Sequence, residues 1–192
     1  KIKMINFLKI LKKENKTYFQ LFFLYSLSHI WILFLSNALF WDDWHLKITS
    51  SDQLDLYWKM VGAPVRGMMI KSLFDLGFYT FRLLSFILLF INAIFLDKIL
   101  ERNKIFNENN RFIVCLIFLI APFYIDRVTI ICFPYTLSTF LFFAAWYFQP
   151  KQKIISLALY IVSFCTNSLL VFYALPTIEN FYLNYSFKKN SI

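Results

Sequence analysis

Long apolar runs separated by short polar segments dominate the chain from residue 18 onward. Five such runs cover residues 18–40, 78–96, 112–125, 128–148 and 154–175. A helix needs roughly 20 apolar residues to cross the hydrocarbon core of a bilayer. The first run contains no Asp, Glu, Lys or Arg, and Arg82 alone interrupts the second. The pattern therefore predicts an all-α, polytopic transmembrane helix bundle with about five spans.

The same pattern divides the chain into three parts. Residues 1–16 form a basic, amphipathic segment that we expect on the cytoplasmic surface of the membrane. Residues 17–185 form the transmembrane bundle, with a long external loop at 41–77, and residues 186–192 form a tail. The first run is longer than the ~7–15 apolar residues of a signal peptide, so we expect it to remain as an anchor.

Composition favours lipid over water as the surroundings of this chain. Hydrophobic residues make up 59% of the sequence and charged residues only 16%, whereas globular chains run nearer half apolar with about a quarter charged. The net charge of +9 would suit a nucleic-acid-binding protein, but the lysines flank apolar runs and form no patch with exposed aromatic residues. Attraction to an anionic cytoplasmic leaflet explains them more simply, so no nucleic-acid partner is expected.

The distribution of Lys and Arg predicts which segments face the cytoplasm. Basic residues cluster before the first run, between the second and third runs, and between the fourth and fifth. These alternate segments can all be cytoplasmic, which gives a cytoplasmic amino terminus and places the 41–77 loop outside. One pair departs from the pattern, because an outward exit of the fifth run is followed by Lys188 and Lys189.

The 41–77 loop is much longer than an ordinary connection between helices. Residues 51–60 within it have the pattern of a short, capped amphipathic helix, which suits the outer membrane interface. Trp41, Trp44 and Trp58 also match an interfacial aromatic belt.

The loop opens with the acidic pair Asp42 and Asp43. His29, Ser36 and Asp43 are seven residues apart, so they would share one face if the first helix continued through them. Polar side chains in lipid turn toward the bundle interior, so Asp43 is expected to point inward over a cavity near the outer surface. Asp42, rotated by about 100°, would face elsewhere. The alternative is that both residues only mark the solvated end of a helix.

Basic residues are expected on the same side of the membrane as this acidic pair. Arg66 lies among small residues at 62–67, where a guanidinium can approach a phosphate bidentately, and Lys71 follows it. Asp126 and Arg127 come after a run of only 14 residues. Such a helix covers roughly 21 Å of the ~30 Å hydrocarbon core. The pair is therefore expected in a water-lined recess, or alternatively in a solvated hairpin turn.

Other polar and sulfur-bearing residues within the runs are expected to be structural. Arg82 near the outer end of the second run can extend its guanidinium to the interface. Cys115, Cys132 and Cys165 show no CxxC or Cys/His spacing and are interpreted as small buried hydrophobic residues.

Two short motifs resemble the multi-spanning C-type (GT-C) glycosyltransferases, in particular bacterial members that decorate O-antigen and related surface glycans. The motifs are Phe-Trp-Asp-Asp-Trp at 40–44 and Gly-Ala-Pro-Val-Arg-Gly at 62–67. Members of the family often have Asp-Asp followed by Gly-Arg-Pro, whereas Pro here precedes Arg by two positions. Because the family usually has more spans, residues 17–185 resemble its amino-terminal part.

The resemblance implies that a sugar is transferred from a polyprenyl-phosphate-linked donor to a cell-surface glycan or lipid acceptor. The reaction would take place on the external face of a bacterial inner membrane, as part of cell-envelope polysaccharide biosynthesis. By motif position, Asp43 or Asp42 would act as a general base or as a metal-associated carboxylate, with a divalent metal ion as an optional cofactor at the pair. The alternatives are a polysaccharide polymerase or flippase-type protein, a non-catalytic membrane subunit, and a transporter fragment.

The resemblance also implies cationic residues at the donor phosphate. Arg66, helped by Lys71 and Arg127, would bind this phosphate and stabilise it as it departs. Asp126 and His29 are expected to support these groups at the outer mouth of the bundle.

Overall fold

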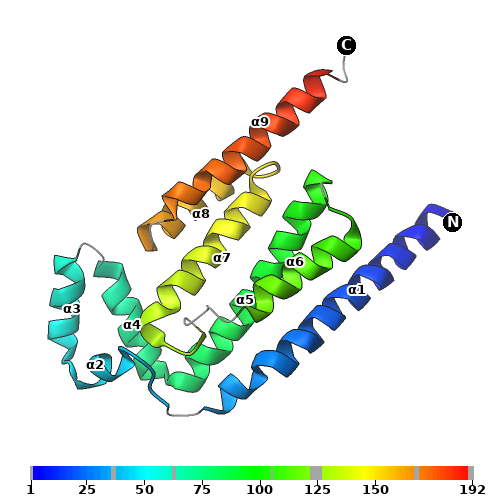
Figure 1. Ribbon diagram of the computed structural model, residues 1–192. Coiled ribbons are helices and arrows are strands. Elements are labelled where there is room, and N and C mark those ends of the chain that lie inside the picture. Colours follow the sequence, from blue (N-terminus) through cyan, green and yellow to red (C-terminus); the bar gives the residue numbers. More distant parts are fainter. Residues whose placement is uncertain are drawn as a thin grey trace.

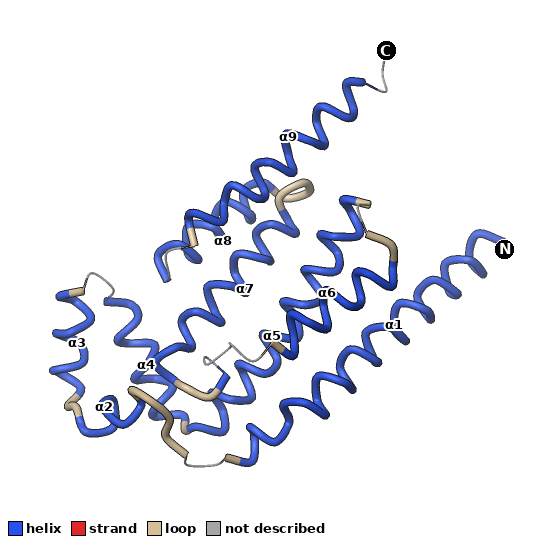
Figure 2. Tube along the Cα trace, in the orientation of Figure 1, coloured by secondary structure: helices blue, strands red, loops and turns tan. Residues whose placement is uncertain are grey.

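A computed structural model describes residues 2–35, 38–61, 64–104, 106–121, 127–166 and 169–189. These residues form helices joined by short loops and contain no strand (Figure 1, Figure 2). The α-helices are α1 (Ile2–His29), α2 (Asp43–Ile48), α3 (Ser51–Met60), α4 (Pro64–Leu76), α5 (Phe78–Asn103), α6 (Glu108–Ile120), α7 (Phe133–Phe148), α8 (Lys153–Thr166) and α9 (Ala174–Lys189). Short 3₁₀ turns are η1 (Ile30–Phe34), η3 (Ile130–Cys132) and η4 (Leu170–Tyr173). The all-α class predicted from the sequence is confirmed.

Three helical segments among the described residues are long and apolar enough to cross a membrane. They are Lys16–Phe34 in α1 and η1, Phe78–Asn103 in α5, and Ile130–Phe148 in η3 and α7. The 26 residues of α5 extend over roughly 39 Å, more than the ~30 Å hydrocarbon core. Two further apolar helices, α6 with 13 residues and α8 with 14, are shorter than one full crossing. The membrane class expected from hydropathy is therefore supported, while the count of five spans stays a prediction.

Helix α5 forms the centre of the bundle, with α1 and α6 on one side and α7 on another. Apolar side chains from α1, α5 and α6 meet in one buried cluster: Leu21, Tyr25, Phe86, Leu89, Ala93, Cys115 and Leu119. A second cluster joins α2, α3 and α4 to α5 and to the η3–α7 segment: Leu46, Trp58, Ile70, Leu73, Phe81, Ile130 and Phe133. This second cluster fixes the segment between α1 and α5 against the bundle.

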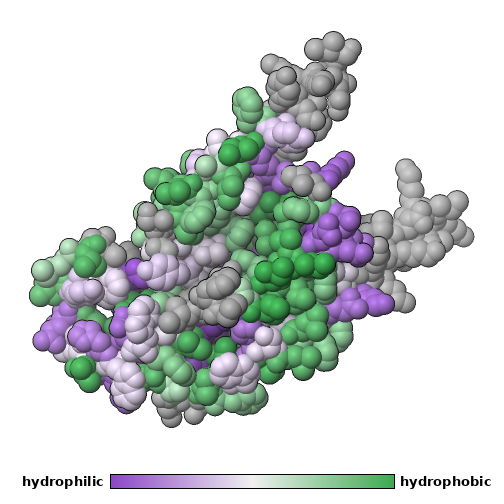
Figure 3. All heavy atoms as spheres, viewed as in Figure 1, coloured by the Kyte–Doolittle hydropathy of each residue, from purple (hydrophilic) through white to green (hydrophobic). Residues whose placement is uncertain are grey.

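The helices α2, α3 and α4 lie together at one end of the molecule, which we call the loop end (Figure 1). Hydrophilic residues gather over α2 and α3, whereas hydrophobic residues cover the middle of the bundle over α6 (Figure 3). The exposed side chains of Ile113 and Ile117 belong to this hydrophobic surface. Large exposed apolar side chains along the middle of a helix bundle suit contact with lipid.

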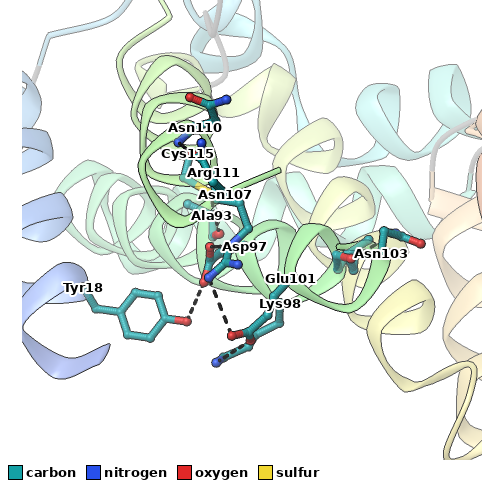
Figure 4. A network of polar contacts seen from close by, with 11 residues as sticks. Tyr18, Ala93, Asp97, Lys98, Glu101, Asn103, Asn107, Asn110, Arg111 and Cys115 are labelled. Carbon is teal, nitrogen blue, oxygen red and sulfur yellow. Dashed lines mark hydrogen bonds and ion pairs between the residues drawn. The ribbon is translucent and has the colours of Figure 1, made fainter. Parts of the chain in front are cut away.

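A polar network fixes the end of the bundle opposite the loop end (Figure 4). The Asp97 carboxylate on α5 accepts a hydrogen bond from the Tyr18 hydroxyl on α1 at 2.9 Å and from Arg111 Nε on α6 at 3.0 Å. Beside it, Lys98 forms an ion pair of 3.1 Å with Glu101. Asp97 is only 9% exposed, so water can solvate little of its charge. The donors from Tyr18 and Arg111 compensate that charge within the protein.

The structure differs from the sequence prediction at the fifth apolar run, 154–175. Helix α8 runs antiparallel to α7, because Ser156 Oγ donates to the carbonyl of Ala145 and Ser163 Oγ to that of Ser138, both at 2.8 Å. It ends at Thr166, and the chain then turns back.

Contacts of η4 and α9 establish this reversal. The Tyr173 ring of η4 lies 4.9 Å from that of Tyr160 in the middle of α8. Glu179 on α9 then accepts hydrogen bonds from Arg102 Nε at 2.9 Å and from Trp146 Nε1. Helix α9 therefore returns toward the ends of α5 and α7, away from the loop end (Figure 1). The run 154–175 thus contains α8 and η4, and together with α9 these form a helical hairpin.

Candidate functional site

The acidic pair begins a new helix and does not extend the first one. Helix α1 ends at His29, η1 continues to Phe34, and α2 starts at Asp43 after a loop in which Trp41 has a φ of 51°. The continuous helix assumed in the seven-residue spacing argument is therefore wrong, and Ser36 lies outside the described residues. The burial of Asp43 has another physical cause.

Asp43 is completely buried because its carboxylate binds the start of η3. Its two oxygens accept hydrogen bonds from the backbone N–H groups of Ile130 and Ile131, each at 3.1 Å. N–H groups in the first turn of a helix lack intrahelical partners, and they attract negative charge. Asp43 thus supplies a cap from a distant part of the sequence and holds the beginning of the 41–77 loop against η3.

The environment of Asp43 also changes its proton affinity. Burial raises the pKa of this carboxyl above its ordinary value, because a charged carboxylate is poorly solvated there. The N–H donors of Ile131 and Ile130 and the nearby Arg82 guanidinium oppose this effect without cancelling it. A carboxylate sealed in this way is better suited to positioning the loop than to direct contact with a substrate.

Asp42 has the opposite environment, since its side chain is exposed and lines a surface pocket of about 560 Å³. The polar lining of this Asp42 pocket comes from Asp42, His45, Thr49 and Gln53 on or beside α2 and α3. Its other lining residues are Leu46, Leu54, Tyr57, Trp58 and Ile131. The pocket therefore combines a carboxylate, an imidazole, a hydroxyl and an amide with two aromatic side chains, a set suited to a polar ligand that also has apolar faces.

Arg66 lies behind the wall of the Asp42 pocket. Its guanidinium is stacked between the rings of Trp58 and Tyr135, at 4.7 and 4.9 Å from their centroids, and Nη2 donates to the Ile131 carbonyl at 3.4 Å. Gly67 allows Trp58 to approach α4 this closely, because a Cβ at that position would lie 3.0 Å from Trp58 Cδ1. Arg66 and Asp43 therefore both bind the 130–131 backbone, from different elements.

Lys71 lies elsewhere. Its exposed side chain lines a separate pocket of about 330 Å³ between α3 and α4, together with Asp52, Asp55 and Lys59. Because Lys71 does not line the Asp42 pocket, the structure does not bring together all the basic residues assigned to one phosphate site.

Arg127 is also in a different place from the one expected. Its side chain is only 5% exposed and points toward α1, where Nη1 contacts His29 Nε2 and the guanidinium lies 5.8 Å from the centre of the Tyr25 ring. Its Nη2 donates to the Leu119 carbonyl. His29 therefore supports Arg127, whereas neither residue lines the Asp42 pocket. Asp126 lies outside the described residues.

The sequence analysis missed the burial of Arg82. We expected its guanidinium at the membrane interface, but the side chain is only 1% exposed, and Nη2 donates to the carbonyl of Ala38. The rings of Phe40 and Phe78 lie 5.8 and 5.6 Å from it. The one sequence signal was its charge within an apolar run, which marks a residue that needs a partner inside the protein.

The donor set does not fit a divalent metal ion at the acidic pair. Both oxygens of Asp43 accept backbone N–H groups, which leaves Asp42 and His45 as the available ligands there. Among the described residues, no group of three His, Cys, Asp or Glu side chains is close enough to hold a metal.

Taken together, these residues form two layers at the loop end. An exposed pocket contains Asp42 and His45, the buried Asp43 and the half-buried Arg66 bind the 130–131 backbone, and the buried Arg82 binds the Ala38 carbonyl. Comparison with known proteins adds no family to this description, since no family model, no curated protein and no solved structure matches the chain.

Proposed function

We propose that this chain is a membrane glycosyltransferase of the C type, or the amino-terminal part of one. It would transfer a sugar from a polyprenyl-phosphate-linked donor to a surface glycan or lipid acceptor. The observation that supports this proposal best is the Asp42 pocket. There, an exposed carboxylate lies among hydrogen-bonding side chains and the aromatic residues Tyr57 and Trp58. Sugars present hydroxyl groups at their edges and apolar C–H groups on their faces, and this lining can bind both.

The proposal places the chain in the bacterial inner membrane with the basic start of α1 in the cytoplasm. Helices α1, α5 and α7 would cross the bilayer, and the shorter α6 would lie in it between α5 and α7 in the chain. The α8–α9 hairpin would enter the membrane and return. The loop end then faces outward, with the amphipathic helix α3 at the outer interface.

In the proposed reaction, Asp42 acts as the general base. Its carboxylate takes the proton of the acceptor hydroxyl, and the hydroxyl oxygen attacks the anomeric carbon of the donor sugar. The bond from that carbon to the phosphate oxygen breaks, and the lipid phosphate leaves with the electron pair. Asp43 is then a positioning residue, because its bonds to Ile130 and Ile131 hold α2 and Asp42 over the pocket.

Arg66 is a cation that contacts two residues lining this pocket. Its guanidinium binds the carbonyl of Ile131, which lines the pocket, and stacks on Trp58, which also lines it. We propose that the positive charge of Arg66 stabilises the phosphate as it leaves, acting through the side of the pocket formed by Trp58 and Ile131. The assignments of Lys71 and Arg127 to the same phosphate stay predictions.

The direct test is transfer of labelled sugar from polyprenyl phosphate by membranes that contain the intact protein. Asp42→Asn should lower the rate by about 100-fold or more, the range of a lost general base, with unchanged thermal stability. Asp75→Asn, an exposed carboxylate on α4 outside the pocket, is the matched control and should keep the full rate. Full activity of the Asp42→Asn protein would rule out the base assignment.

A non-catalytic membrane subunit is the second candidate. The complete use of the Asp43 carboxylate by backbone donors favours it, since such a contact is structural and needs no substrate. In that case the Asp42→Asn chain would still assemble with its partner and the surface glycan would be unchanged.

A further inference from the structure

The lining of the Asp42 pocket carries negative charge and no matching positive charge. Among its described lining residues, Asp42 is the one acidic side chain, and none is Lys or Arg. Lys47 is exposed on α2 but does not line the pocket. Asp42 precedes α2, yet its exposed carboxylate makes no capping hydrogen bond to that helix. The charge of Asp42 is therefore available to a ligand in the pocket.

Two of the other polar groups in the lining are engaged within the protein. Thr49 Oγ1 donates a hydrogen bond to the His45 carbonyl at 2.7 Å. Gln53 Oε1 accepts hydrogen bonds from the backbone N–H of Ser50 at 3.3 Å and from Ser50 Oγ at 3.1 Å. Asp42 therefore has the largest influence on which charge a ligand of this pocket can carry.

The positive charge of Arg66 acts on a different side of the pocket. Its guanidinium binds the Ile131 carbonyl and stacks on Trp58, and both of these residues line the pocket. A departing donor phosphate suits the side that Arg66 supports, and the sugar that loses a hydroxyl proton suits the side of Asp42. An acidic group on that second sugar would meet the Asp42 carboxylate without a compensating cation, and such an unpaired like charge selects against a ligand.

We propose that the Asp42 side of the pocket is the acceptor subsite, and that it takes an uncharged sugar or an amino sugar and excludes a uronic acid. This inference rests on the proposed function, because an acceptor exists only if a sugar is transferred. The charge preference of the pocket is a property of binding, so it can be measured without transfer.

The test compares three methyl glucosides that differ only at the carbon outside the ring, which bears a protonated amino group, a hydroxyl group or a carboxylate. Ligand-observed NMR titration at neutral pH measures their dissociation constants for the intact chain in micelles of a nonionic detergent. Two unit charges about 6 Å apart in water change an affinity roughly threefold. We therefore expect the amino sugar to bind about tenfold more tightly than the acidic sugar, with the hydroxyl sugar between them. This range should nearly disappear at about 1 M salt, where the Debye length is about 3 Å.

The variant Asp42→Asn removes the charge from the pocket and should bring the three dissociation constants to within about twofold of one another. Asp75→Asn removes the same charge from an exposed position on α4 outside the pocket, so it is the matched control and should keep the full range. Thermal unfolding checks that each variant is folded. If Asp42→Asn does not fold, the salt dependence of the unaltered chain decides the question.

Three results would overturn the inference: no binding of any of the three sugars, equal binding of the acidic and hydroxyl sugars, or an unchanged range in the Asp42→Asn protein. Transfer of labelled sugar separates this inference from the proposed function. Transfer by a chain whose pocket shows no charge preference refutes the acceptor subsite alone. The expected preference without any transfer refutes the glycosyltransferase and with it the acceptor role, while the charge preference of the pocket stands.

Discussion

At the scale of single residues, Asp42 and Asp43 show how position decides the role of a side chain. The two carboxylates are adjacent in the sequence, yet Asp43 is fully buried and Asp42 is exposed at the pocket. The difference arises because the N–H groups of Ile130 and Ile131 are available to only one of them. Sequence analysis identified the acidic pair and expected Asp43 over a cavity with Asp42 facing elsewhere, whereas Asp42 lines the pocket and Asp43 is sealed against backbone that lies 87 residues away.

Because the pKa of Asp43 is raised in the folded protein, we expect the stability of the protein to depend on pH. An Asp carboxyl in the unfolded chain has a pKa of about 3.9, and burial raises the pKa of Asp43 in the folded chain. The folded state therefore keeps a proton over a pH range in which the unfolded state has lost it. This contribution to stability is complete below the unfolded pKa and is lost as pH rises through the folded pKa.

Thermal unfolding between about pH 4 and pH 7 checks this expectation. The melting temperature of the unaltered protein should decline as pH rises from the unfolded pKa, and Asp43→Asn should remove that part of the decline. Asp75→Asn, at an exposed position, is the control and should retain the decline. Equal slopes for the Asp43→Asn variant and the unaltered protein would contradict the assignment.

Gly67 offers a second prediction at this scale. A Cβ there would meet Trp58 Cδ1 at 3.0 Å and Trp58 Cβ at 3.1 Å, and these atoms cannot move without displacing the indole. Overpacking costs about 1–3 kcal/mol, and replacing a helical Gly by Ala returns up to about 1 kcal/mol, so Gly67→Ala should destabilise the protein by about 1–2 kcal/mol. Chemical denaturation measures the change, and Ser72→Ala on the exposed side of α4 should stay within about 0.5 kcal/mol of the original.

At the scale of elements, the α8–α9 hairpin depends on the pair between Arg102 and Glu179. Arg102 binds both carboxylate oxygens, at 2.9 and 2.6 Å, and the side chains are only 23% and 9% exposed. Removing one partner of such a pair leaves the other charge poorly solvated. The pair thus fixes where α9 returns to the bundle.

Glu179→Ala should therefore destabilise the protein by about 3 kcal/mol, at the low end for buried pairs because Arg102 keeps some contact with solvent. The exposed pair of Lys59 and Asp55 on α3 provides a comparison, and Lys59→Ala should cost no more than about 0.5 kcal/mol. A double-mutant cycle with Arg102→Ala and Glu179→Ala measures the coupling directly. A coupling as small as that of the exposed pair would show that the hairpin does not depend on this contact.

Local and distant contacts explain which elements were predictable. Helix α3 has the predicted bounds because its Ser50–Gln53 capping box and amphipathic pattern are local signals. The new helix that starts at Asp43 and the reversal after Thr166 were missed, because Asp43 binds the distant backbone of η3 and Glu179 binds the distant Arg102. Hydropathy is high both in a single crossing helix and in an apolar helical hairpin, so it could not distinguish them.

At the scale of the whole molecule, the helical hairpin changes the expected membrane topology. The start of α1, the α5–α6 and α7–α8 connections and the end of α9 all lie at the end opposite α2, α3 and α4 (Figure 1). The sequence analysis placed the exit of the fifth run outside, and Lys188 and Lys189 were its one exception. With α9 returning, this basic end falls on the same side as the other basic segments, which is the arrangement that the positive-inside rule favours.

This arrangement predicts that both ends of the chain face the cytoplasm. In the bacterial inner membrane that we propose for this chain, each reporter works on one side only, so green fluorescent protein fused after Ile192 should fluoresce and alkaline phosphatase at the same position should be inactive. In a Cys165→Ser background, Ile48→Cys on α2 should react with an impermeant maleimide in intact cells, whereas the matched Lys151→Cys variant should react only after permeabilisation. Both positions are exposed, so a difference between them reports the side of the membrane. Active phosphatase after Ile192 would mean that the chain crosses once more than the hairpin allows, and α9 could then not return to Arg102.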